Sequence, residues 1–313
     1  MTNLRVIFMG TPDFAVPCLD ILVSSGYNIV AVVTQPDRPK GRGQKIAESP
    51  VKQAALTYGL PVLQPNKVKE VDFQVELSLL KPDIIVVVAF GQLLPKSILD
   101  LPILGCVNVH ASLLPLYRGA APIHWSIIKG DKITGVTTMY MDIGMDTGDM
   151  ILKEEVPIRE TETTGELHDK LKGVGAKVLN ETIKLIVAKE APRTKQNNEC
   201  ATYASMLTRE LEGVKWRESA ISIHNLVRGL NPWPGAYCLY QGKNLKLWRT
   251  RVFTMDDVVN HPGRIAKITS EGFVVETGQG MIELLEVQPA SKRRMSANDF
   301  ICGYGLIVGD ILE

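Results

Sequence analysis

The sequence has little cysteine, no long apolar run and almost no net charge, and each absence excludes a class of protein. Its five cysteines are widely spaced and odd in number, which gives neither a disulfide framework nor a CxxC metal knuckle. No apolar stretch approaches the roughly 20 residues that a membrane helix needs. A strand-like segment begins at Arg5, so we expect no signal peptide. These absences predict a cytoplasmic protein without membrane segments.

The charge balance excludes a protein that is basic all over. The 35 basic and 34 acidic residues leave a net charge of +1, which still permits a local basic patch. Apolar residues make up 45% and charged residues 22%, the ordinary values for a folded globular chain. A length of 313 residues corresponds to one large domain or two ordinary ones.

The first 160 residues or so alternate apolar, β-branched runs with helix-length segments. Continuous apolar strands separated in this way predict an α/β fold whose mostly parallel sheet is covered on both faces. A capping box at Thr163 and Glu166 begins a long helix that closes this domain near residue 188. The expected strands are Arg5–Gly10, Ile29–Thr34, Asp83–Ala89, Gly105–His110, Ile133–Met141 and Asp149–Pro157.

The rest of the chain has a different pattern. Residues 189–206 are polar and predict an interdomain linker. A helix follows around Trp216–Leu230, and from Asn231 onward short strands alternate with Gly/Pro turns, which predicts a small β-barrel. We therefore expect a first domain over 1–188, a linker over 189–206 and a second domain over 207–313.

Asn108 and His110 are the first candidates for chemistry. They point to the same side of a predicted strand, near its carboxyl end, where open α/β sheets bind ligands. An amide donor beside an imidazole can stabilise an oxyanion and move a proton. A capped strand end with a hydrogen-bonded histidine explains the same residues equally well.

Three loops are further candidates. The loop Met141–Asp149 holds three carboxylates, one of which could orient His110; a structural turn is the alternative. The long loop Gln35–Lys45 has a local charge of +3, which suits a phosphate backbone, and a solvated loop is its alternative. The turn Gly10–Phe14 is not GxGxxG, which disfavours a nicotinamide dinucleotide site.

Read together, these motifs resemble the methionyl-tRNA formyltransferase family over nearly the whole chain. The signature N-x-H-x-S-L-L-P is found at Asn108–Pro115, and Tyr117–Ile123 and Asp146–Gly148 match as well. These three are shared with other folate-dependent formyltransferases. The tRNA enzymes are distinguished by the segments Gly10–Phe14, Thr34–Arg38 and Asn231–Ala236. Two positions depart from the family pattern, His124 and Met206.

The resemblance implies a Rossmann-like formyltransferase domain followed by an OB-like barrel. It also implies transfer of the formyl group of 10-formyltetrahydrofolate to the α-amino group of methionine on initiator methionyl-tRNA, with no metal. Asn108, His110 and Asp146 would be catalytic. Folate would lie against Val86, Phe90, Gly91, Leu93, Ser112, Leu113, Leu114, Pro115 and Ile143. The tRNA would contact Arg38, Lys40, Arg42, Lys45, Lys292, Arg293 and Arg294.

Two other functions compete with this one. A folate-dependent formyltransferase acting on a small amine would need neither the basic loop nor a second domain. A non-catalytic tRNA-binding protein would not need Asn108, His110 and Asp146. We expect the protein to be a monomer.

Overall fold

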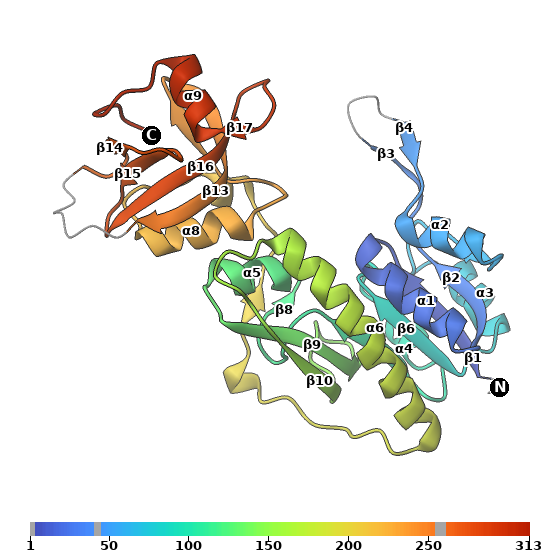
Figure 1. Ribbon diagram of the computed structural model, residues 1–313. Coiled ribbons are helices and arrows are strands. Elements are labelled where there is room, and N and C mark those ends of the chain that lie inside the picture. Colours follow the sequence, from blue (N-terminus) through green and yellow to red (C-terminus); the bar gives the residue numbers. More distant parts are fainter. Residues whose placement is uncertain (1–3, 41–44, 254–260) are drawn as a thin grey trace. The chain divides into compact units, whose positions relative to one another are not determined.

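The computed structural model describes residues 4–40, 45–253 and 261–313 (Figure 1). It divides into two compact units, which we describe separately. The N-terminal unit contains residues 1–122, 133–157 and 168–204, and the C-terminal unit contains 123–132, 158–167 and 205–313. The chain therefore passes from one unit to the other five times.

The N-terminal unit is built on a central sheet of seven strands. They are β1 (Arg5–Gly10), β2 (Asn28–Val33), β5 (Val62–Leu63), β6 (Ile84–Val88), β7 (Cys106–His110), β9 (Ile133–Tyr140) and β10 (Met150–Pro157). Their order is β10-β9-β7-β6-β1-β2-β5. The five strands from β7 to β5 run parallel, β9 runs antiparallel to β7, and β10 runs antiparallel to β9. The predicted mostly parallel sheet is confirmed.

Helices cover this sheet on both faces (Figure 1). They are α1 (Val16–Ser24), α2 (Pro50–Thr57), α3 (Val71–Leu79), α4 (Lys96–Leu99) and α6 (Thr164–Ala188), with the short 3-10 helices η1 (Asp13–Ala15) and η2 (Asn198–Cys200). Ile7 and Met9 of β1 form a core with Phe73 and Leu77 of α3. On the opposite face α6 comes close to the sheet at Gly175, where a Cβ would lie 3.2 Å from a methyl group of Val109.

Two small strand pairs extend the N-terminal unit. The hairpin β3 (Arg38–Lys40) and β4 (Lys45–Ala47) is antiparallel and extends beyond α2 in Figure 1. The parallel pair β8 (Arg118–Gly119) and β11 (Tyr203–Ala204) joins the segment after α6 to the region just beyond β7. Thr194 also exchanges two backbone hydrogen bonds with Met150 of β10. Much of the segment predicted as a polar linker is thus attached to the N-terminal unit.

The C-terminal unit holds a curled antiparallel sheet of six strands. They are β12 (Tyr237–Tyr240), β13 (Lys243–Phe253), β14 (Ile265–Ile268), β15 (Phe273–Glu276), β16 (Met281–Pro289) and β17 (Met295–Ser296). The main order is β12-β13-β16-β15-β14, with β17 on β16. Bridges from Leu312 to Tyr240 and from Ile311 to Arg264 link the two outer strands through the chain end. This curled sheet confirms the predicted OB-like fold.

Helices complete the C-terminal unit: α5 (Pro122–Ile128), α7 (Arg209–Glu212), α8 (Ala220–Gly229) and α9 (Ala297–Tyr304). Ile223 and Val227 of α8 and Phe300 of α9 bury their side chains with Phe273 and Leu284 of the sheet. No helix among the described residues is long and apolar enough to cross a membrane.

The unit also includes two earlier stretches of the chain. The buried guanidinium of Arg228 donates to the carbonyl oxygens of Arg159 and Glu162, and the Thr164 hydroxyl donates to Gly229 O at 2.7 Å. The boundaries 1–188, 189–206 and 207–313 remain a prediction about independently folding domains.

Candidate active site

The candidate site is built on the carboxyl end of β7. Asn108 and His110 are two residues apart on this strand and lie on one side of it, and their exposed fractions are only 9% and 6%. β7 is held between β6, its parallel neighbour, and β9, its antiparallel one. Because both flanking strands bond to it, the backbone that carries these two side chains is fixed.

Asp146 brings the three predicted catalytic residues together. Its Oδ1 lies 3.5 Å from Asn108 Nδ2, and its Oδ2 lies 3.7 Å from His110 Nδ1. The same Oδ2 accepts a hydrogen bond from the backbone N–H of Gly119 at 2.8 Å. One carboxylate therefore faces an amide, an imidazole and a peptide N–H.

The tautomer of His110 follows from its other contact. Its Nε2 lies 2.9 Å from the carbonyl oxygen of Tyr117. Because a carbonyl oxygen only accepts, Nε2 carries a proton. Nδ1 is then left facing Asp146, and a proton placed on Nδ1 would lie between the imidazole and the carboxylate.

The loop that carries Asp146 is folded by its own side chains. Asp142 Oδ1 accepts hydrogen bonds from the N–H of Gly144 at 2.9 Å and from the hydroxyl of Thr147 at 2.6 Å. Asp146 itself has φ of +54°, a left-handed conformation that costs energy for a residue with a Cβ. Strained backbone conformations of this kind cluster at functional sites, so the φ of Asp146, next to His110 and Asn108, supports a functional role for this loop.

The segment Ser112–Pro115 is fixed just beyond β7. The Ser112 hydroxyl donates to Leu116 O at 2.6 Å, and the Thr137 hydroxyl donates to Ser112 O at 2.7 Å. The ammonium of Lys153 donates to Leu114 O, and burial lowers the pKa of this lysine below its ordinary value.

A cleft of about 500 Å³ opens at the carboxyl ends of β1, β2 and β6. The chain goes from β1 to β2 on one side and later to β6 on the other, so this is the switch point of the sheet, where such folds bind ligands. Its lining residues include Thr11, Pro12, Gln35, Arg38, Phe90 and Gly91. Thr11 and Gln35 both donate to Phe90 O, which ties the three strand ends together.

The residues predicted to contact folate range from buried to exposed. The side chains of Val86, Phe90, Ser112 and Leu114 are buried, at 2% or less. Leu93 and Ile143 are exposed by 61% and 81%. Phe90 and Gly91 also line the cleft, so it reaches part of the predicted folate surface.

The predicted tRNA-binding loop is only partly described. Arg38 lies in β3 and lines the cleft; Lys40 is the last residue of β3, and Lys45 is the first residue of β4. Arg42 lies outside the described residues. At the base of the hairpin, Asp37 Oδ2 lies 2.5 Å from Lys52 Nζ, and this hydrogen bond holds the pKa of Asp37 below its ordinary value.

The predicted basic cluster of the C-terminal unit lies beside β17. Lys292, Arg293 and Arg294 are exposed. The guanidinium carbon of Arg294 stacks 3.5 Å from the centre of the Trp248 ring, a cation–π contact.

Two other features lie outside the predicted site. Asp13, His168 and Asp169 could offer three ligand atoms to a metal, but the ammonium of Lys172 lies 2.6 Å from Asp169 Oδ1 and 3.6 Å from Asp13 Oδ2. This lysine already compensates their charge.

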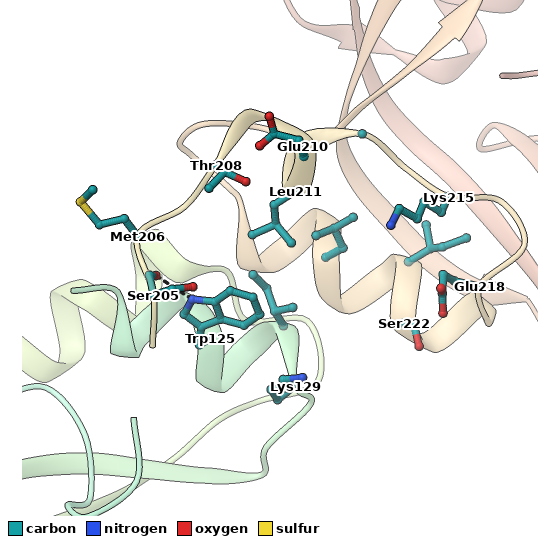
Figure 2. A pocket seen from close by; sticks show the side chains of 14 residues that line it. Trp125, Lys129, Ser205, Met206, Thr208, Glu210, Leu211, Lys215, Glu218 and Ser222 are labelled. Carbon is teal, nitrogen blue, oxygen red and sulfur yellow. Dashed lines mark hydrogen bonds between the residues drawn. The ribbon is translucent and has the colours of Figure 1, made fainter. Parts of the chain in front are cut away.

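In the C-terminal unit, a cavity of about 550 Å³ lies between α5 and α8 (Figure 2). Trp125 Nε1 donates to Ser205 O at 2.9 Å along its wall. Met206, a position that departs from the family pattern, projects at its edge and is 74% exposed.

The sequence did not predict the residues that support the predicted catalytic residues Asn108, His110 and Asp146. The Gln196 amide donates to the backbone oxygens of Asp146 and Gly148, and Tyr117 O accepts from His110. Gln196 stands in a polar segment without periodicity, so no pattern marks it. Tyr117 begins the matched segment Tyr117–Ile123, but its contact with His110 is made by its backbone, which no residue type predicts.

Comparison with known proteins gives the class that this fold and site define. The formyl transferase family model matches residues 3–183, and the model of the formyl transferase C-terminal domain matches residues 206–305. Among solved structures, an N-formyltransferase from Helicobacter canadensis, in complex with folinic acid and dTDP-3-aminofucose, matches with a TM-score of 0.68 and 20% identity. The match covers 91% of this chain and 99% of that one, and it supports the fold.

Curated relatives are more specific. A methionyl-tRNA formyltransferase of Alkaliphilus oremlandii is 50% identical over 309 residues, covering 99% of both chains. One of Clostridioides difficile is 49% identical, covering 99% of this chain and 100% of that one. The chain belongs to the methionyl-tRNA formyltransferase family, which confirms the resemblance seen in the sequence.

Proposed function

We propose that this protein transfers the formyl group of 10-formyltetrahydrofolate to the α-amino group of methionine on initiator methionyl-tRNA. Formylation of the tRNA-bound methionine follows from membership of a family whose curated members are about half identical to this chain over almost its full length. The donor is a tetrahydrofolate derivative. The 10-formyl form fits because its formyl group sits on a nitrogen that can leave once it is protonated.

The reaction needs a site for negative charge. When the neutral amine of methionine attacks the formyl carbon, the carbonyl oxygen becomes an oxyanion. Asn108 Nδ2 can donate a hydrogen bond to it in a site that is largely closed to water. The Nδ1–H of a doubly protonated His110 can donate a second one, since Nε2–H already binds Tyr117 O and Nδ1 lies 3.7 Å from Asp146. Fixed donors in such a site stabilise developing charge without reorganising during the reaction.

The reaction also needs proton transfer. The attacking amine must lose a proton, and the folate nitrogen must gain one as its bond to the formyl carbon breaks. Asp146 faces both His110 and Asn108, so its carboxylate can accept the amine proton, directly or through water, and orient the imidazole. The proton then passes to the leaving nitrogen, which regenerates the site.

The two substrates would use different sets of residues. We place folate against the predicted contacts Val86, Phe90, Gly91, Leu93, Ser112, Leu113, Leu114, Pro115 and Ile143. We place tRNA phosphates against Arg38, Lys40, Arg42 and Lys45 of the basic loop Gln35–Lys45 and against the cluster Lys292, Arg293 and Arg294. The two sets come together at the cleft, which is lined by Arg38 from the tRNA set and by Phe90 and Gly91 from the folate set.

The observation that carries this proposal is the convergence of Asn108 and His110 on the Asp146 carboxylate. The test is an assay of the purified protein with 10-formyltetrahydrofolate and charged initiator tRNA. We expect formyl-methionyl-tRNA, and no comparable turnover with free methionine or with a sugar amine. Turnover that is faster with the small amine would overturn the acceptor. Because the acceptor takes part in translation, we also place the protein in the cytoplasm. A monomer remains our expectation from the sequence.

A further inference from the structure

Gln196 binds the backbone on which Asp146 is carried. Its side-chain amide nitrogen donates to Asp146 O and to Gly148 O, both at 2.8 Å. Both contacts cross about 50 residues of sequence, from the segment after α6 to the loop between β9 and β10. The two N–H groups of one amide therefore span three consecutive residues of the candidate catalytic loop.

The other end of the same amide is held just as firmly. Gln196 Oε1 accepts from Arg118 Nε at 3.0 Å and from Arg118 Nη2 at 2.7 Å. Arg118 is only 2% exposed, and its Nη2 also donates to Asn198 Oδ1 at 2.9 Å. A charged donor pair on a buried guanidinium fixes the orientation of the amide, so its nitrogen must point to the loop.

The loop needs such a restraint. Asp146 has φ of +54°, and a non-glycine residue in that region is strained, so it persists only where its surroundings hold it. Gln196 binds the carbonyl of this same residue, whose side chain faces His110 at 3.7 Å. A turn of that peptide would swing the carboxylate away from the imidazole.

We propose that Gln196 is a positioning residue for formyl transfer, clamping the Asp146 peptide so that the carboxylate faces His110. The inference rests on the proposed role of Asp146. It is specific to the Asp146–Gly148 backbone, and it assigns a function to a segment that the sequence marks only as a polar linker.

The first test is Gln196→Glu. Glutamate keeps the length and the oxygen that binds Arg118 but has no N–H for the two carbonyl oxygens. We expect kcat to fall about 10- to 100-fold, since a misplaced catalytic group can cost that much, while KM for folate and for tRNA changes less than about twofold. Gln196→Met, which also lacks the donors but adds no charge, should give the same division between kcat and KM.

Asn198→Ala is the matched control. Asn198 binds the same Arg118 nitrogen as Gln196, and its oxygen makes no contact with the Asp146 loop among the interactions described. It should therefore keep kcat within about twofold of the unaltered protein. An equal loss of kcat in Asn198→Ala and Gln196→Met would assign the effect to Arg118 and overturn the inference.

The decisive test places Gln196→Met in an Asp146→Asn protein and measures single-turnover rates. If Gln196 acts through Asp146, its substitution should have no further effect once the carboxylate is gone. An undiminished loss in the double variant would overturn the inference. If Asp146→Asn alone is fully active, the proposed catalytic role of Asp146 is wrong and the inference falls with it. If Asp146→Asn is inactive while both Gln196 variants keep full kcat, only the role of Gln196 is wrong.

Discussion

Single side chains at the candidate site divide into those proposed to contact the substrates and those that hold these contact residues in place. Asn108 and His110 come from one strand, and Asp146 comes from a loop 36 residues after His110. The strand pattern places the first two on one side, because side chains alternate. Loop geometry joins the third to them, and no periodic rule predicts which of the three carboxylates in Met141–Asp149 faces inward. The resemblance to a family supplied that choice.

Substitution of Asn108, His110 and Asp146 tests the proposed catalytic role of these residues directly. Asn108→Ala, His110→Ala and Asp146→Ala should each lower turnover by about 10²-fold or more, because each removes a fixed donor or proton acceptor. The measurement is kcat for formylation of initiator methionyl-tRNA, with folding checked by circular dichroism.

His168→Ala is a fair control for His110→Ala. His168 Nε2 lies 3.7 Å from Asp13 Oδ1, the same separation as that between His110 and Asp146, but on an exposed surface. It should keep normal turnover. A well-folded His110→Ala protein with normal kcat would remove His110 from the catalytic group.

A buried histidine in the C-terminal unit predicts a pH-dependent stability. His224 Nε2 lies 3.2 Å from Glu160 O, and burial holds the pKa of this imidazole below its ordinary value of 6.5. The folded protein keeps His224 neutral, whereas the unfolded chain takes up a proton as the pH falls through 6.5. Stability should therefore decrease from that pH down to the lower pKa of the folded state, by at most about 1.4 kcal/mol per pH unit.

Urea unfolding at pH 7.5 and at pH 5.0 measures this effect. His224→Gln removes the titration and should lose less stability between the two conditions than the unaltered protein does. Equal losses in both proteins would show that His224 does not contribute.

At the scale of elements, the sequence predicted best the longer strands of the N-terminal sheet. The expected strands Arg5–Gly10 and Ile133–Met141 are found as β1 and β9 to within a residue. The helix after Thr163 is found as α6, with Glu166 bonded to Thr163 in a capping box. The two-residue strands β8 and β11 were not predicted, because their pairing depends on contacts 85 residues apart and not on any local pattern.

The basic loop Gln35–Lys45 is proposed to bind tRNA, and Arg42 tests this role. Arg42→Ala should lower kcat/KM for tRNA by about tenfold or more, since a hydrogen bond to a charged group contributes roughly 1.5–3 kcal/mol. Folate affinity, measured by fluorescence titration, should not change. The reason is the charge of +3 that Gln35–Lys45 carries in a chain of net charge +1.

Lys96→Ala serves as the control for Arg42→Ala. This lysine is an exposed cation on α4 that already pairs with Asp100 at 2.6 Å. It should leave kcat/KM for tRNA unaffected. The same loss in both variants would mean that general charge, and not the hairpin, attracts the tRNA.

Over the whole molecule, charge is nearly balanced, so tRNA binding must depend on where the basic residues lie. Lys292→Ala/Arg293→Ala should reduce the slope of log affinity against log salt by up to about two, because each lost phosphate contact releases one fewer counterion. Filter binding at several salt concentrations gives this slope. Lys184→Ala, which removes a lysine paired with Glu181 at 2.7 Å, should leave it unchanged. Identical slopes in the double variant and the unaltered protein would remove the cluster from the tRNA interface.

The five passages of the chain between its compact units limit how this protein can be recombined. The last 109 residues, 205–313, look in the sequence like a cassette that could be exchanged between relatives. Yet Arg228 and Gly229 bond to Arg159, Glu162 and Thr164, far upstream. In a chimaera joined only at residue 205, α8 would come from one parent and the segment 158–167 that it bonds to would come from the other. Grafts that also carry 123–132 and 158–167 from the same donor should fold better, because the C-terminal unit is encoded by three separate segments of the chain.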